Sequence, residues 1–330
     1  MSLINCHPEM KKFHSCEVNL SNKQQDEMRG RRDAGRTRLR NGLATNNYPT
    51  YRDIKSQGSY QMRTMVQDSD NEYDIDDGVY FKPEDLVNDD GVELTPKQVR
   101  ERVCEALKWD GRLKKAAEIM KNCVRQEYPE GYHIDYPIYR EIDGKYELAS
   151  GNEWIDSDAQ EVTRWFNGEI KDDLQRGQED TSQLRRLVKL TKKYSRRANW
   201  KNKTTSGIAI TKLVVDCYAS SADRDDVALR QTWKKINNKL DVSTAIEHPV
   251  VDNYITKNAD EEVEFFNRCL TDSLNDLKVL DSYTTTKEEA LQVWDKVFDT
   301  DFFESQYKED SALRKTNNDP VLRSGSTRFG

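Results

Sequence analysis

The stretch Gln57-Gly58-Ser59-Tyr60-Gln61-Met62-Arg63-Thr64 is followed closely by Glu72-Tyr73-Asp74-Ile75-Asp76-Asp77-Gly78-Val79-Tyr80-Phe81. The second segment is rich in strand-forming side chains, and a period of two puts Asp74 and Asp76 on one face of the expected strand. Neighbouring carboxylates repel each other unless a cation lies between them, and oxygen ligands favour Mg²⁺ or Mn²⁺. The segment therefore predicts a site for a divalent metal ion.

The Gly58-Ser59 pair predicts a phosphate-binding turn directly after Gln57. Glycine lets backbone N–H groups approach a phosphate closely, and the Ser59 hydroxyl is a further donor. A Gly-Ser turn or an Asp-x-Asp strand is common where no ligand binds, so each signal is weak alone. Their order is more specific, because a Gly-Ser turn before an Asp-x-Asp strand resembles the active-site signature of the polymerase-β-like nucleotidyltransferases.

That superfamily has a third carboxylate on a later strand, and the candidate lies in Tyr132-His133-Ile134-Asp135-Tyr136-Pro137-Ile138-Tyr139. The period-two pattern places His133 and Asp135 on one face of this strand and apolar side chains on the other. Pro137 lacks an N–H group and so marks a strand end or edge. The three candidate carboxylates are Asp74, Asp76 and Asp135.

Composition bounds the class of protein. The 330 residues are 35% hydrophobic and include six Trp, fifteen Tyr and nine Phe, enough for a substantial core and about two domains. A formal net charge of −7 argues against a dedicated nucleic-acid-binding protein. No apolar run approaches the ~20 residues of a membrane helix, no signal-peptide pattern opens the chain, and the cysteines form no CxxC pair. We therefore expect a cytoplasmic protein with reduced thiols and no membrane association.

Strand signals are confined to the first half of the chain. A long basic helix is expected over 22–43, opened by a capping box of Ser21 and Gln24. Thr95-Pro96 is typical of a second helix start, and a further helix is expected over 113–128. A strand over 145–148 follows the turn at Asp143-Gly144. This half predicts a small mixed sheet with helices.

From Trp154 onward the pattern is helical, with Ser157 and Gln160 forming another capping box. Apolar spacing of three and four predicts helices over 158–176, 182–197, 207–219, 224–240, 259–281 and 286–298. The expected fold class is α+β, with a nucleotidyltransferase core (1–153), a helical nucleotide-binding domain (154–306) and a flexible tail (307–330).

Two residues of the helical half are candidates for binding a triphosphate. Lys192 is a mobile positive charge on a helix, and Ser206 precedes a helix whose first N–H groups are exposed. Lys189 and Lys193 compete for the role of Lys192. A surface lysine and an ordinary N-cap are the simpler interpretation of either residue taken alone.

Together these motifs resemble those of the bacterial cGAS/DncV-like nucleotidyltransferases of anti-phage signalling. The resemblance runs from the long N-terminal helix to Phe303 and includes Glu247-His248-Pro249-Val250. It implies a polymerase-β-like core with a helical domain. It also implies an enzyme that joins nucleoside triphosphates, ATP or GTP among them, into a cyclic di- or trinucleotide with release of pyrophosphate, as a message for a separate effector.

The resemblance further implies a role for each candidate residue. Two Mg²⁺ or Mn²⁺ ions would serve in-line displacement, and Asp74, Asp76 and Asp135 would hold them. Gln57, Gly58, Ser59, Lys192 and Ser206 would bind the nucleotide. Two alternatives stay open: a terminal nucleotidyltransferase that extends RNA, disfavoured by the acidic charge, and a catalytically idle sensor of nucleic acid or a protein partner, disfavoured by the intact carboxylates.

The last residues, 307–330, offer little to bury and predict a mobile tail. A frayed terminus is one interpretation of this segment. The other is that Gly330 is a conjugation handle, because a flexible tail ending in glycine can present its carboxylate for adenylation. Some members of the resembled family are conjugated in this way, which implies a partner resembling ubiquitin-activating or ubiquitin-conjugating enzymes.

Overall fold

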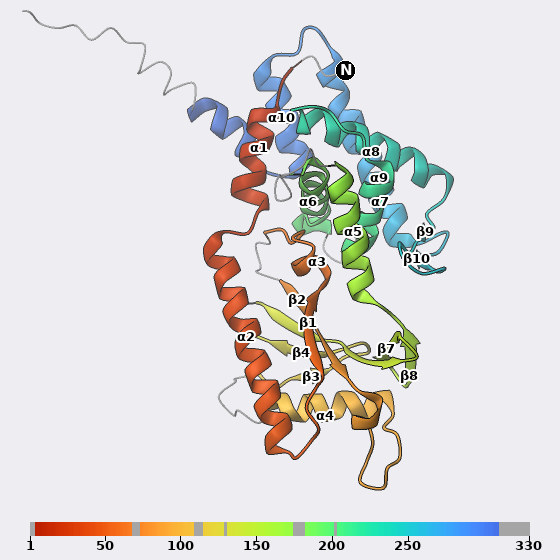
Figure 1. Ribbon diagram of the computed structural model, residues 1–330. Coiled ribbons are helices and arrows are strands. Elements are labelled where there is room, and N and C mark those ends of the chain that lie inside the picture. The colour runs from red at the N-terminus through yellow and green to blue at the C-terminus, as the bar shows by residue number, and fades with distance from the viewer. Residues whose placement is uncertain are drawn as a thin grey trace, which may run out of the picture.

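A computed structural model describes residues 4–67, 73–108, 115–128, 131–173, 182–200 and 203–309. One half of the molecule is a mixed β-sheet flanked by two helices, and the other half is a group of helices that contains a separate core (Figure 1). This arrangement confirms the expected α+β class. None of the helices in the described ranges combines the length and apolar character that a membrane span requires.

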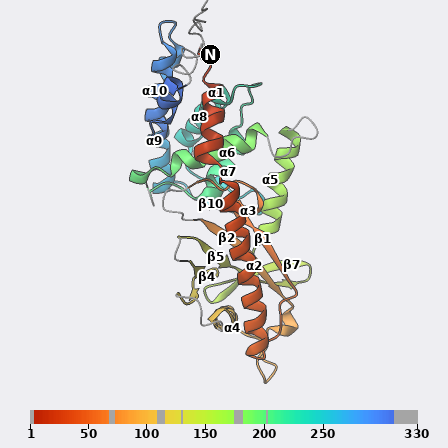
Figure 2. The ribbon, with the colours of Figure 1, turned by 90° about the vertical axis from the view of Figure 1, so that its left-hand side faces the viewer.

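The chain begins in the helical half and then crosses to the sheet. Helix α1 (His7–Phe13) continues into a π-helical turn, η1 (His14–Val18), and the long α2 (Asn22–Thr45) follows (Figure 2). The capping box at Ser21 is present as predicted, whereas α1 gave no clear periodic signal in the sequence. Gly35 lets α2 approach the sheet, since a Cβ there would lie 2.0 Å from the Tyr136 hydroxyl oxygen.

The sheet has the order β3-β4-β5-β2-β6-β7-β8, with β1 antiparallel to β2. Its strands are β1 (Asp53–Gln57), β2 (Asp74–Phe81), β3 (Glu118–Ile119), β4 (Val124–Glu127), β5 (His133–Tyr136), β6 (Ile138–Ile142), β7 (Lys145–Ser150) and β8 (Glu153–Asp156). Strands β5 and β6 both run parallel to β2, and Pro137 separates them as expected from its missing N–H. The Asp143-Gly144 turn joins β6 to β7 with positive φ at both residues.

Two expectations for this half were wrong. The stretch 113–128 is not helical where it is described, because β3 and β4 lie within it and β4 pairs with β5. Its helix-forming composition is overridden by long-range pairing that buries Val124 and Gln126 on one face. Strand signals also do not stop at Trp154, since β8 pairs with β7 through Asp156. Helix α4 (Pro96–Lys108) begins as predicted, with Thr95 and Gln98 as its cap.

The second half contains helices close to those expected. They are α5 (Ala159–Asp173), α6 (Gln183–Ser195), α7 (Gly207–Cys217), α8 (Asp225–Val242), α9 (Glu261–Asp276) and α10 (Lys287–Phe298). This half also contains the short turns η4 (Ala198–Trp200) and η5 (Leu277–Asp281) and the strand pair β9 (Ile246–Glu247) and β10 (Tyr254–Thr256), whereas the short turn η2 (Pro83–Asp85) belongs to the sheet half. The predicted Ser157 cap was wrong, because Asp158 Oδ1 accepts the bonds from the N–H groups of Gln160 and Glu161. Tyr307 packs on the helical core, so the segment expected as a tail begins inside the fold, and residues 310–330 lie outside the described ranges.

Candidate active site

The register between β2 and β5 brings the predicted carboxylates together. Asp76 is opposite Asp135, and Asp74 is opposite His133 in the parallel pair. Burial, followed by the nearby charges of Asp135 and Asp74, raises the pKa of Asp76 from its ordinary value to about 7. Burial likewise raises the pKa of Asp74. The site therefore disfavours three simultaneous negative charges unless a cation offsets them.

The predicted phosphate-binding turn lies directly against these carboxylates. Strand β1 ends at Gln57, which is in register with Asp76, and the short α3 (Gly58–Gln61) begins at Gly58 with a φ of +61°. A Cβ at Gly58 would lie only 2.3 Å from Asp76 Oδ2, so the turn and the metal-site candidate are in contact. The side chain of Gln57 points elsewhere, because its Nε2 donates a 2.9 Å hydrogen bond to the Tyr139 hydroxyl.

Helix α6 contains three lysines, and Lys192 is the one whose side chain extends to the start of α7. A Cβ at Gly207 would lie 3.7 Å from Lys192 Nζ, and Ser206 caps α7 by accepting a bond from the Ala209 N–H. Lys189 Nζ instead donates to Asn19 Oδ1, and Lys193 Nζ donates to the Gln67 carbonyl. The structure thus brings Lys192 and Ser206 together and directs the two competing lysines elsewhere.

Lys192 is buried and is placed to meet a negative charge. Its side chain is 4% exposed, and its ammonium donates a 3.0 Å hydrogen bond to Thr64 Oγ1. Burial, with further contributions from Arg196 and Lys189, lowers the pKa of Lys192 to about 7. The charge of Arg196 also lowers the pKa of Asp74, so Arg196 lies within electrostatic range of both Lys192 and the carboxylates. A triphosphate bound there would stabilise the protonated lysine.

Sequence reasoning missed the residues that pair with the carboxylates. Arg125 on β4 makes a bidentate ion pair with Asp135 at 2.8 and 2.7 Å, and His133 pairs with Asp74. Arg125 was missed because 113–128 was expected to be helical, although its register opposite Asp135 follows once β4 is recognised as a strand. Arg196 gave no signal, because its place near Asp74 depends on how α6 packs.

The donor chemistry of the site fits a hard divalent cation. Three carboxylates supply the oxygen ligands that Mg²⁺ and Mn²⁺ prefer. Within the described residues, no three acidic, histidine or cysteine side chains converge on a single point. Two of the three carboxylates are instead engaged in ion pairs, because Arg125 pairs with Asp135 and His133 pairs with Asp74. An incoming ion would compete with these pairs for the same carboxylates.

The raised pKa of Asp76 predicts how stability depends on pH. Between about pH 4 and 7 the native state keeps a proton that the unfolded chain has lost, so the free energy of unfolding falls as pH rises through this window. We expect Asp76→Asn to unfold about 2–4 °C higher than the wild type at pH 8 and nearly alike at pH 5. Thermal unfolding at both pH values checks this, and equal pH dependence in the two proteins would contradict it. Mg²⁺ at pH 8 should stabilise the wild type more than the variant.

Comparison with known proteins agrees with this geometry. Residues 52–139 match the family model described as Cyclic GMP-AMP synthase DncV-like, nucleotidyltransferase domain. A Cyclic GMP-AMP synthase of Escherichia albertii is 27% identical over 202 residues, which are 59% of this chain and 43% of that protein. The alignment thus spans less than half of this curated relative.

Solved structures share the fold over most of the chain. Vibrio cholerae DncV cyclic AMP-GMP synthase with the linear intermediate 5′ pppA(3′,5′)pG matches with a TM-score of 0.70 and 17% identity, covering 89% of this chain and 95% of that one. The Escherichia coli MS115-1 CdnC:HORMA-deltaN complex matches with a TM-score of 0.65 and 15% identity, covering 89% and 97%.

The sheet order, the Gly-Ser turn and the paired carboxylates define a nucleotidyltransferase of the polymerase-β-like fold. Within that class, residues 52–139 match the cGAS/DncV-like nucleotidyltransferase domain, and the chain shares its fold with DncV over most of its length.

Proposed function

We propose that this protein joins nucleoside triphosphates into a cyclic di- or trinucleotide with release of pyrophosphate. The observation that carries the proposal is the placement of Asp76 beside Asp135 on one side and of a buried Lys192 at the start of α7 on the other. One side is suited to metal ions and the other to a triphosphate. The intermediate in the Vibrio cholerae relative's structure, pppA(3′,5′)pG, is the kind of species that such a site would close into a ring.

The residues divide the chemistry between them. Asp74 and Asp76 would hold two Mg²⁺ or Mn²⁺ ions, and Asp135 would help to hold one of them. The ions, when bound, offset the charge of the triphosphate and promote loss of the proton from the attacking ribose hydroxyl. That hydroxyl oxygen forms a bond to the α-phosphorus as the bond to pyrophosphate breaks. The triphosphate would be oriented by Gln57, Gly58, Ser59, Lys192 and Ser206, with Gln57 contributing through its backbone.

The two halves of the chain would have separate tasks. In this proposal residues 1–153 supply the catalytic core, residues 154–306 bind nucleotide, and residues 307–330 serve as a tail. The enzyme would act in the cytoplasm in anti-phage defence, with ATP or GTP as substrates and a separate effector as the receiver of its product. The HORMA complex of the Escherichia coli relative is an example of a protein partner on the same fold.

Labelled nucleoside triphosphates with Mg²⁺ or Mn²⁺ test the proposal. A cyclic product has no terminal phosphate, so the label should resist phosphatase, and mass spectrometry should give its ring size and bases. A phosphatase-sensitive product that grows on added RNA would favour a terminal nucleotidyltransferase instead. Absence of any product, with nucleotide still bound, would favour an idle sensor.

A further prediction concerns Gly330, which lies outside the described residues. If Gly330 is a conjugation handle, changing it to Glu should eliminate high-mass conjugates in cells, because its carboxylate could no longer be adenylated in a narrow channel. Nucleotide synthesis by the purified variant should equal that of the wild type. Immunoblotting of both proteins expressed in cells checks this, and conjugates that persist in the variant would rule it out.

A further inference from the structure

Thr64 links the phosphate-binding turn to the buried lysine. Its side chain is fully buried, and its Oγ1 accepts a 3.0 Å hydrogen bond from Lys192 Nζ. The Thr64 carbonyl oxygen also accepts from this nitrogen, at 3.5 Å. Within the described ranges, both acceptors of the Lys192 ammonium thus belong to a single residue, and that residue has no part in the chemistry proposed above.

The backbone around Thr64 ends the short helix α3. The Thr64 N–H donates to the Ser59 carbonyl, and the Arg63 N–H donates to the Tyr60 carbonyl. Arg63 lies between these bonds with a φ of +55°. Two such bonds around a left-handed residue form a Schellman motif, which glycine would fit without strain. The turn that brings Thr64 to Lys192 is therefore formed although an arginine stands at its left-handed position.

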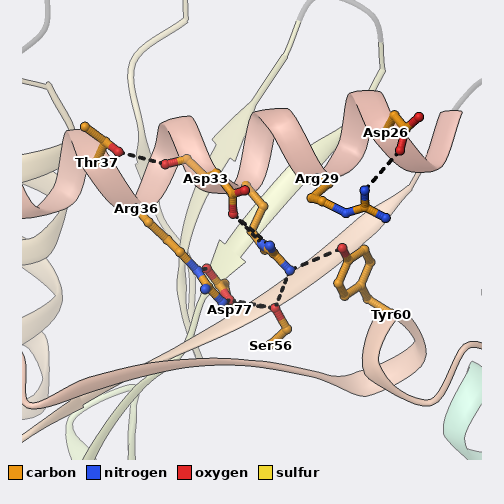
Figure 3. A network of polar contacts seen from close by, with 9 residues as sticks. Asp26, Arg29, Asp33, Arg36, Thr37, Ser56, Tyr60 and Asp77 are labelled. Atoms are coloured by element: carbon orange, nitrogen blue, oxygen red, sulfur yellow. Dashed lines mark hydrogen bonds and ion pairs between the residues drawn. The ribbon is translucent and has the colours of Figure 1, made fainter. Parts of the chain in front are cut away.

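Helix α3 is also anchored to α2. The Tyr60 hydroxyl accepts a 3.2 Å bond from Arg32 Nη1 (Figure 3). Arg36, further along α2, binds the fully buried Asp77 of the sheet at 2.6 and 2.5 Å (Figure 3). The short helix is thus held to α2 through Tyr60 and to α6 through Thr64, so the phosphate-binding turn and the lysine have a fixed relative position.

The contact leaves the Lys192 ammonium ready to bind a phosphate. An ammonium has three N–H donors, and Thr64 offers acceptors for two of them. Nζ also lies near the start of α7, since a Cβ at Gly207 would be 3.7 Å from it. Burial, then Arg196 and Lys189, lowers the pKa of Lys192, and no described carboxylate offsets these two charges. The ammonium is therefore short of negative partners until a triphosphate binds.

A purely structural role would not require a hydroxyl at position 64. Valine has nearly the shape of threonine, and a buried hydroxyl is costly unless it is paired. The equally buried Thr211 of α7 donates its hydroxyl to the Gly207 carbonyl of its own helix. Thr64 instead directs its hydroxyl oxygen to the lysine of the candidate active site.

We propose that Thr64 is a positioning residue for nucleotide joining, which holds the Lys192 ammonium at the triphosphate and ties it to the phosphate-binding turn. This inference deepens the proposed function and rests on it for the role of Lys192. Because the hydroxyl accepts a bond from the charged form of the lysine, it favours that form. Loss of the hydroxyl should loosen the ammonium and lower the pKa of Lys192 below its value of about 7.

Calorimetric titration with tripolyphosphate, without metal ions, tests this role in Thr64→Val at pH 5.5 and pH 8. The relevant signal is the binding that Lys192→Ala abolishes. If the pKa of Lys192 falls by about one unit, binding should be about eightfold weaker than in the wild type at pH 8. At pH 5.5 both proteins keep the lysine protonated, and the difference should be less than about twofold. Protonation of the probe is the same for both proteins and cancels in the ratio.

Two variants are controls for this titration. Thr64→Ser keeps the hydroxyl and should bind tripolyphosphate as the wild type does at both pH values. Thr211→Val removes a hydroxyl from an equally buried position and should also leave binding unchanged. In nucleotide joining, the loss in Thr64→Val should appear in KM more than in kcat, because Lys192 would bind the triphosphate before the reaction as well as during it.

Equal weakening at both pH values would overturn the proposal, because a general structural defect does not follow the charge of Lys192. Unchanged binding in Thr64→Val, or the same loss in Thr64→Ser, would also overturn it. If Thr64→Val does not fold, Thr64→Ala compared with Thr64→Ser gives the same test. The titration needs no turnover, so a wild-type protein that made no cyclic product would refute the proposed function while the binding data still decided the role of Thr64.

Discussion

Changing Asp74 and Asp76 together to asparagine is expected to lower nucleotide joining by at least about 10³-fold while the protein stays folded. Metal ions contribute several kcal/mol of charge stabilisation in the transition state, and each 1.4 kcal/mol is a factor of ten in rate. The fold should survive because the two carboxylates are crowded and one of them has a raised pKa of about 7. Product formation from mixed nucleoside triphosphates, with circular dichroism on the same samples, measures both quantities.

Asp77 supplies a matched control on the same strand. Its side chain is fully buried against Arg36 and Ser56, away from the carboxylate pair. Asp77→Asn should lower the free energy of unfolding, because it leaves the partly buried Arg36 guanidinium without its full partner, yet the folded protein should keep most of its activity. Retained synthesis in the Asp74/Asp76 double variant would contradict the active-site assignment. An equal loss of activity in Asp77→Asn would show that the assay responds to the reduced stability of the protein and not to loss of the metal ligands.

Gly58→Ala is the second change with a large expected effect, about 10²-fold or more in activity. The added Cβ would fall 2.3 Å from Asp76 Oδ2, so either the turn or the carboxylate must move. A displacement of about 1 Å at a reacting centre can cost two powers of ten in rate. Steady-state kinetics of the variant with each nucleotide should show the loss mainly in kcat/KM.

Gly144→Ala separates the clash from backbone strain. Gly144 has a φ of +78°, close to the +61° of Gly58, but a Cβ there meets nothing within 4 Å. Gly144→Ala should therefore lower the free energy of unfolding by about 1–2 kcal/mol and leave kcat/KM unchanged. If both variants lose activity in parallel, contact between the turn and Asp76 is not what requires glycine at position 58.

What the sequence could predict was local. The Ser21 capping box, the turn at Asp143-Gly144 and the alternation of Asp74 and Asp76 each depend on residues within a few positions of one another. Strand β4 could not be predicted in this way, because its four residues become a strand only by pairing with β5. For the same reason Arg125 could not be recognised as the partner of Asp135, because its position opposite Asp135 depends on the pairing of β4 with β5.

The candidate active site shows the same difference between features set by neighbouring residues and features set by long-range packing. Gly58, Ser59 and the carboxylates follow an order along the chain that a reader can recognise. The sequence could not choose among three lysines, because their different partners, Asn19, Thr64 and Gln67, belong to segments more than 120 residues away.

The docking of α1 has a consequence for how the chain is made. Phe13 packs against Phe298 and Phe303 with ring centroids 4.8 Å apart in both pairs, and the Cys6 N–H donates to Asp226. A ribosome releases these partners more than 200 residues after α1 itself. The sheet can form its core during synthesis, but Met10 and Phe13 stay without their binding surface until α8 and α10 emerge. Docking of α1 therefore waits until α8 and α10 have been synthesised, and the apolar side chains of Met10 and Phe13 stay exposed until then.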